Sequence, residues 1–178
     1  MLQFSHLFRY IMFAVPVTVT ILDTVGSIAL VNGDSMAPTL NPSNETSRDI
    51  VLIDKISIAP KLLQRGDIVI LDSPTDPKRQ IVKRLIGLSG DWVKKRNGDL
   101  QNISKGKCWI EGDNHETSES YGPLPLPLIR AKVVCVIWPP SRWGWVNNKD
   151  QHTKDRLFIA NNERVGDFPR RINNDSFW

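Results

Sequence analysis

Two stretches of the sequence decide the fold: "RGDIVILDSP" at residues 65–74 and "QIVKRLIGLSGDWV" at residues 80–93. Each is a short run rich in β-branched residues and bounded by Gly, Pro or Asp, which is typical of strands joined by turns. Three more runs of this kind are "DIVLIDKIS" at 49–57, "GKCWIEGDN" at 106–114 and "LIRAKVVCVIWPP" at 128–140. Little of the chain between Pro42 and Pro140 has helical periodicity. The sequence therefore predicts a mainly β, antiparallel domain whose sheet is folded over or barrel-like.

The composition fits one water-facing domain with a core of its own. The 178 residues include 24% charged and 40% hydrophobic residues, with a formal net charge of +4. No dense Lys/Arg block is present, so nucleic-acid binding is not expected, and the basic balance suits anionic lipid at least as well. The histidines are scattered and no CxxC occurs, so we expect no metal and no cofactor. Cys108 and Cys135 lie in strand-like runs, and two buried small side chains are favoured over a disulfide.

The most apolar part of the chain precedes the strands. The uncharged run at residues 10–22 is shorter than the roughly 20 residues that a membrane-spanning helix needs, and reaches that length only with "VGSIALV" at 25–31. His6 and Arg9 precede the run, which keeps the N-terminus on the positive-inside face. A removable signal peptide lacks a persuasive cleavage site here, and Pro16 with its β-branched neighbours disfavours a core helix. We interpret this part as a single membrane anchor.

The chain is accordingly divided into three parts. Residues 1–31 form the N-terminal membrane anchor with one transmembrane helix, and residues 32–145 form the β domain. Residues 146–178 are polar and are expected to form a loosely ordered tail.

A candidate nucleophile follows the apolar part directly, at Ser35 in "VNGDSMAPTLNP". A serine hydroxyl needs a base beside it, and the one histidine of the folded region, His115, lies in a loop-like setting. The alternative base is a lysine that is desolvated until its amine is neutral. Lys83 lies in the apolar "IVKRLIGL", and strand alternation puts Lys83 and Arg84 on opposite faces, so that one can point inward while the other stays in water. Taken alone, Ser35 fits a turn residue and Lys83 a surface lysine better.

Four blocks in a fixed order change that balance. They are "GDSMAPTL" at 33–40, "RGDIVIL" at 65–71, "KRLIGLSGD" at 83–91 and "GDNHETS" at 112–118. Together they resemble the type I signal peptidases, which are membrane-anchored serine proteases with a Ser/Lys dyad. Further stretches, such as "YGPLPL" at 121–126 and "VIWPPSRWG" at 136–144, are similar to the mitochondrial inner-membrane branch of that family.

The resemblance implies a role for each matching residue. Ser35 is expected to be the nucleophile and Lys83 the general base, with the backbone N–H of Ser35 stabilising the oxyanion. Ser118 is expected to orient the lysine. The remaining supporting residues are Met36 and Pro38, which shape the turn and the cleft, and Arg84, Asp91 and Asp113, which brace the strands around the dyad.

The chain departs from the family pattern at two places. Gly33 stands where many bacterial relatives have a hydroxyl side chain that assists the oxyanion. The block that begins "GDNHETS" is shortened after Ser118 and lacks the D-S-R/N element of the family. The surroundings of Lys83 are therefore expected to differ, with Glu119 or Ser120 replacing the lost polar groups in part.

The function that the resemblance implies is removal of hydrophobic sorting or signal sequences from proteins delivered to the mitochondrial intermembrane space. The enzyme is expected at the inner membrane, with its catalytic domain facing that space and a small residue preferred before the scissile bond. The implied partners are a second catalytic subunit in a heterodimer, precursor proteins and membrane lipid. A non-catalytic stabilising subunit and a bacterial-type signal peptidase at a plasma membrane are the alternatives.

Overall fold

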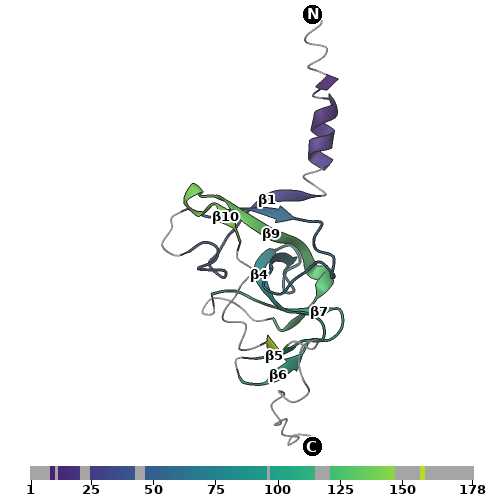
Figure 1. The fold of residues 1–178 in the computed structure, drawn as a ribbon, viewed down its shortest axis with the longest axis vertical. Coiled ribbons are helices and arrows are strands. Elements are labelled where there is room, and N and C mark those ends of the chain that lie inside the picture. The colour runs from purple at the N-terminus through teal and green to yellow at the C-terminus, as the bar shows by residue number, and fades with distance from the viewer. Residues whose placement is uncertain are drawn as a thin grey trace, which may run out of the picture.

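The computed structural model describes residues 9–10, 12–20, 25–42, 47–95, 97–114 and 121–146, and the backbone of 157–158. Most strands belong to one antiparallel sheet with the order β1-β2-β9-β3-β4-β7-β8, and β10 pairs with β9 (Figure 1). Its strands are β1 (Gly26–Leu30), β2 (Ile50–Asp54), β3 (Ile68–Asp72), β4 (Gln80–Gly87), β7 (Lys107–Glu111), β8 (Pro123–Pro125), β9 (Ile129–Trp138) and β10 (Gly144–Trp145). The prediction of a mainly β, antiparallel fold is confirmed.

A smaller sheet lies at the opposite end of the domain from the N-terminal helix (Figure 1). It consists of β5 (Trp92–Lys94), β6 (Leu100–Asn102) and β11 (Leu157–Phe158), in the order β11-β5-β6. Two short 3-10 helices, η1 (Leu126–Leu128) and η2 (Pro140–Arg142), flank β9. The strand β11 is the part of the expected polar tail that the structure describes beyond Val146; the rest of that tail lies outside the described residues.

The expectation for the second apolar run is wrong. Residues 25–31 were expected to complete a membrane-spanning segment, but Gly26–Leu30 forms β1, which pairs with β2 from Gly26↔Asp54 to Leu30↔Ile50. A strand is possible because β2 supplies the backbone hydrogen bonds and because Gly26 has no side chain: a Cβ there would lie 2.6 Å from the carbonyl oxygen of Ile53. Residues 9–10 and 12–20 are helical (Figure 1). Within the described residues, no helix has the length and apolar character needed to cross a bilayer.

The core lies on both sides of β3, whose residues alternate between two clusters. Ile68 and Ile70 pack with Met36, Leu40 and other residues of the first cluster. Val69 and Leu71 pack in a second cluster, with residues of β4, β7 and β9. β3 is therefore buried on both faces. It pairs with β4, which carries Lys83, so Lys83 lies beside the core.

Both cysteines are buried and free, as the sequence indicated. Cys108 belongs to the second core cluster, on β7, and Cys135 lies on β9. Burial raises the pKa of the Cys108 thiol to about 11. The thiol therefore acts as a small apolar side chain at neutral pH.

Candidate active site

Ser35 lies in the segment 31–42, which follows β1 directly and is called the nucleophile loop below. Its side chain is partly buried, whereas Met36 and Leu40 of the same loop are 1% and 0% exposed and anchor it in the first core cluster. Gly33 has a φ of 87°, a left-handed conformation that strains any other residue. This explains why a hydroxyl side chain is absent from that position.

Lys83 lies in the middle of β4, directly opposite Val69 of β3. Its residue exposure is 4%, so the sequence hypothesis of a desolvated lysine is compatible with the structure. Arg84 is equally buried, at 3%. The expectation that one of the two cations stays in water is therefore wrong, and the polar clamp described below accounts for the buried guanidinium.

Ser35 and Lys83 line the same cleft, which has a volume of about 400 Å³. One wall is formed by residues 29–33 together with Ser35 and Met36, and the other by residues 79–83, with Ile70 and Tyr121 completing it. Pro38, which was expected to shape the cleft with Met36, is exposed and does not line it. The cleft brings the two candidate catalytic side chains together from segments that are almost fifty residues apart in sequence.

Both walls of the cleft carry strand edges that are open in the described part of the chain. β1 stands at the end of the sheet, with β2 as its one neighbour. β7 pairs with β4 only from Arg84 onward, so Gln80–Lys83 has a paired strand, β3, on one side. Open edges present backbone N–H and C=O groups, which suit a peptide bound in an extended conformation.

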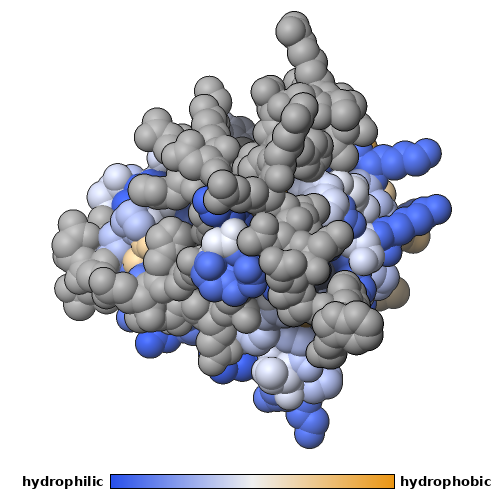
Figure 2. All heavy atoms as spheres, turned by 90° about the horizontal axis from the view of Figure 1, so that it is seen from below, coloured by the Kyte–Doolittle hydropathy of each residue, from blue (hydrophilic) through white to orange (hydrophobic). Residues whose placement is uncertain are grey.

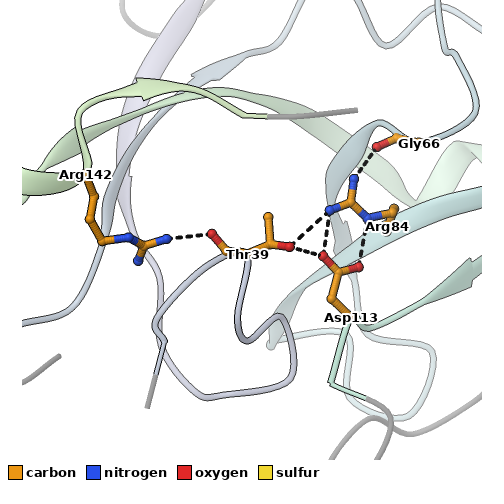
Figure 3. A network of polar contacts seen from close by, with 5 residues as sticks. All are labelled: Thr39, Gly66, Arg84, Asp113 and Arg142. Atoms are coloured by element: carbon orange, nitrogen blue, oxygen red, sulfur yellow. Dashed lines mark hydrogen bonds and ion pairs between the residues drawn. The ribbon is translucent and has the colours of Figure 1, made fainter. Parts of the chain in front are cut away.

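Arg84 forms a polar clamp behind the cleft (Figure 3). Its Nε and Nη2 donate to the two carboxylate oxygens of Asp113 at 2.8 and 2.6 Å, and its Nη1 donates to the Gly66 carbonyl at 2.8 Å. Thr39 accepts from Nη2 at 3.3 Å and donates to Asp113. The clamp therefore ties the nucleophile loop to β4 and to the segments around Gly66 and Asp113.

Asn114 holds the backbone at Ser35 itself. Its N–H donates to the Ser35 carbonyl at 3.1 Å, and its side-chain amide donates to the Asp34 carbonyl at 3.2 Å. Sequence reasoning did not single out Asn114, although it belongs to the "GDN" of the fourth block. The contact fixes the direction of the peptide plane that follows Ser35.

Comparison with known proteins gives the family. The model of the family "Signal peptidase, peptidase S26" matches residues 4–101. The chain belongs to this signal peptidase family. Among its relatives, mitochondrial inner membrane protease subunit 2 of Danio rerio is 44% identical over 135 residues, covering 73% of this chain and 74% of the relative. The same subunit of Saccharomyces cerevisiae (strain ATCC 204508 / S288c) is 40% identical over 138 residues, covering 73% and 78%.

The resemblance to the mitochondrial branch of the family, which the motifs indicated, is thereby confirmed. Mitochondrial inner membrane protease subunit 1 of Mus musculus is also similar, at 39% identity over 132 residues, with 70% of this chain and 76% of the relative covered. This signal peptidase therefore resembles proteins named as two different subunits of one protease.

The shortened fourth block of this signal peptidase leaves Arg84 well paired. Ser118, with Glu119 and Ser120, lies outside the described residues. Arg84 nevertheless donates to Asp113, Thr39 and Gly66, so the missing D-S-R/N element is not needed to satisfy the guanidinium.

Arg142 is a second cation that reaches the nucleophile loop, and sequence reasoning missed it. It donates to the Thr39 carbonyl at 2.7 Å (Figure 3). It also pairs with Asp49, which is fully buried. Asp49 in turn accepts from the Asn41 N–H at 2.8 Å, and the Asn41 side chain bonds the carbonyls of Val31 and Gly33. The sequence signal was the arginine inside the "VIWPPSRWG" stretch.

Asp91 acts away from the cleft. It forms a bidentate pair with Arg65, with both distances 2.8 Å, and accepts from the Leu88 N–H at 2.9 Å. The hydrogen bond to Asp91 raises the pKa of the Arg65 guanidinium. Asp91 therefore closes the turn between β4 and β5, in agreement with a bracing role.

Proposed function

We propose that the chain is a membrane-bound serine endopeptidase that removes hydrophobic sorting sequences from proteins delivered to the mitochondrial intermembrane space. The observation that carries this proposal is the shared cleft, which is lined by Ser35 and by the buried Lys83. The names of the relatives supply the compartment, the mitochondrial inner membrane.

In the proposed reaction, Lys83 acts as a neutral amine. Its burial disfavours the charged ammonium, which is what a general base in this position requires. The amine takes the proton of the Ser35 hydroxyl as the oxygen attacks the scissile carbonyl, and the proton then goes to the leaving amine. Water hydrolyses the acyl-enzyme with Lys83 again as base. The Ser35 N–H faces the negative charge that develops on the carbonyl oxygen.

An extended precursor segment would lie between β1 and the first half of β4. The open edges of Ala29–Val31 and Gln80–Lys83 both border the cleft, so a peptide between them can bond to backbone groups on two sides. Such binding does not depend on the side chains of the substrate, apart from the small residue proposed before the scissile bond. It therefore suits an enzyme that cleaves several precursors.

An apolar surface supports contact of the domain with lipid. Ile28 and Leu52 face each other across β1 and β2, and Leu52 and Trp145 both pair with Cys135 of β9. Ile28 and Trp145 are 59% and 81% exposed. The end of the domain farthest from the helix is mostly hydrophilic in its described residues (Figure 2). Exposed Trp side chains are typical of a membrane interface. We therefore propose that the face with Ile28, Leu52 and Trp145 lies against the inner membrane, with the N-terminal helix as part of the anchor.

The proposed partner is the second catalytic subunit of a heterodimer. This rests on the similarity of the chain to relatives named subunit 1 and subunit 2 of the same protease. Co-purification of the tagged full-length chain with a subunit 1 relative, from fractionated mitochondria, tests both the partner and the compartment. Recovery from a plasma-membrane fraction would favour the bacterial-type alternative.

The reaction is tested with Ser35→Ala and Lys83→Ala variants of the full-length protein in detergent, on a precursor peptide that spans the sorting sequence. Loss of either side chain is expected to lower kcat by at least about 10³-fold, because the two act as a unit. The exposed Lys78 and Ser141 provide matched controls as Ala variants. Equal cleavage by all proteins would rule out the dyad, and folded but inactive wild-type protein would favour the non-catalytic subunit.

A further inference from the structure

Arg79 lies at the start of the cleft wall formed by β4, and its side chain is exposed. Its backbone is fixed on both sides, since its N–H donates to the Asp76 carbonyl at 2.9 Å and its carbonyl accepts from the Ser73 N–H at 2.8 Å. The guanidinium has no hydrogen bond or ion pair with any described residue. The side chain is therefore available to a ligand in the cleft.

The lack of a partner among the described residues distinguishes Arg79 from the other arginines of the described β domain. Each of these donates to a nearby acceptor: Arg48 to Asn32, Arg65 to Asp91, Arg84 to Asp113, Arg130 to Asp72 and Arg142 to Asp49. The carboxylate that could have served Arg79 from the adjacent strand, Asp72, is occupied by Arg130.

The charge of the cleft is one-sided. None of its lining residues is Asp or Glu, and its two basic lining residues are Arg79 and Lys83. Since Lys83 acts as a neutral base in the proposed reaction, Arg79 is the lasting positive charge of the described lining. An unpaired guanidinium in such a setting favours a planar anion that can accept two parallel hydrogen bonds, and a carboxylate has this geometry.

The register sets the distance of this charge from the chemistry. Arg79 and Lys83 are four residues apart along an extended segment, so they point to the same face and their Cα atoms are about 13 Å apart. A substrate strand that lies along β4 has the same rise per residue. Its side chain about four residues from the scissile bond therefore comes opposite Arg79.

We propose that Arg79 is a specificity-determining residue that selects precursors with an Asp or Glu side chain about four residues from the scissile bond. The inference rests on the proposed peptidase function and names a substrate class for it. A peptide carboxylate is favoured over a lipid phosphate because Arg79 lines the same cleft as Ser35.

The experiment uses the full-length protein, with its co-purified partner, in neutral detergent. A parent precursor peptide receives a single Asp at each position from two to six residues on either side of the scissile bond, and each Asp peptide is matched by an Asn peptide. At one position about four residues away, the Asp peptide is expected to have a kcat/KM about tenfold higher than its Asn counterpart. This preference should decrease with salt, since the site is open to solvent.

Arg79→Gln is expected to abolish the Asp preference and Arg79→Glu to reverse it toward a Lys peptide. Lys78→Gln removes the same charge one residue away, outside the cleft lining, and is expected to keep the preference. Equal cleavage of Asp and Asn peptides by the wild type would overturn the role of Arg79 while leaving the peptidase intact. If Arg79→Gln instead changed only binding to phosphatidylglycerol vesicles, the anion would be a lipid phosphate and the inference wrong. A wild type that cleaves no peptide would contradict the proposed function itself.

Discussion

The two halves of β4 differ in almost every respect that matters for the site. From Arg84 onward, the strand pairs with β7. Arg84 also pairs with Ile68 of β3, and Leu85 is bonded to the backbone of Gly66 and Asp67. The Arg84 side chain donates to Asp113, Gly66 and Thr39. Before Arg84, Gln80–Lys83 has β3 as its described neighbour, and Arg79 has no partner among the described residues. Arg84–Gly87 is called the locked half below, and Gln80–Lys83 the open half. The comparison teaches that, in the proposed function, one strand both holds the catalytic framework and receives the peptide.

The largest effect is expected where the locked half is broken. Arg84→Ala would leave Asp113 without its cation and the Gly66 carbonyl without its donor, so the free energy of unfolding should fall by about 3–5 kcal/mol. Urea unfolding of the full-length protein in detergent measures this change. Arg130→Ala removes an exposed pair with Asp72 and should have little effect. Similar losses of unfolding free energy in both variants would mean that the buried clamp contributes no more to stability than an exposed ion pair.

Cys108 lies on β7, the strand that pairs with the second half of β4, and it makes the stability of the protein depend on pH. The folded pKa of about 11 lies above the ordinary thiol pKa of 9.0, so the neutral thiol contributes stability below pH 9. This contribution, about 2–3 kcal/mol, is lost as the pH rises through 9 to 11, because the unfolded state ionises first. The measurement is the pH dependence of unfolding in wild type and Cys108→Ala over this window. Identical dependences in the two proteins would contradict the buried thiol.

A smaller effect is expected from the hydroxyl that joins the clamp to the nucleophile loop. Thr39→Val keeps the shape of the side chain but removes its bonds to Asp113 and Arg84. The expected loss is about 1 kcal/mol in stability, with a lower kcat and an unchanged KM, because the loop carries Ser35 and the open half binds the peptide. Thr75→Val, on the exposed hairpin, is the control. An increase in KM alone would place Thr39 in substrate binding.

The smallest signal distinguishes the two halves directly, by hydrogen exchange. The amides of Arg84–Gly87 should exchange more slowly than those of Gln80–Lys83 in the free protein, since this half pairs with β7 while Arg84 and Leu85 are also held on the other side by residues 66–68. Adding uncleaved precursor peptide to the Ser35→Ala variant should slow exchange within Gln80–Lys83 by a few fold and leave Arg84–Gly87 unchanged. Protection of both halves, or of neither, would argue against binding along the open edge.

The sequence predicted what depends on local pattern. The strands around Ile68–Asp72 and Gln80–Gly87 were found because β-branched runs between turn residues leave a clear signal. β1 was missed because an apolar run next to another apolar run fits a membrane segment as well as a strand. The pairing of β1 with β2, which decides for the strand, is not visible in the sequence.

The candidate site was predictable only in part. Ser35 and Lys83 followed from the blocks, and the structure places both at one cleft. The burial of Arg84 and the contacts of Asn114 and Arg142 were not predictable, because they join residues 29, 80 and 103 positions apart. No local pattern encodes such pairings.

The contact between Arg142 and the Thr39 carbonyl has a consequence for how the chain folds as it emerges. During synthesis or import, a protein emerges from its N-terminus, so Ser35 appears long before residue 142. Until that late arginine arrives, the segment around Ser35 lacks one of the groups that give it its final shape. We therefore expect the nucleophile loop to reach its final shape only after residue 142 has emerged.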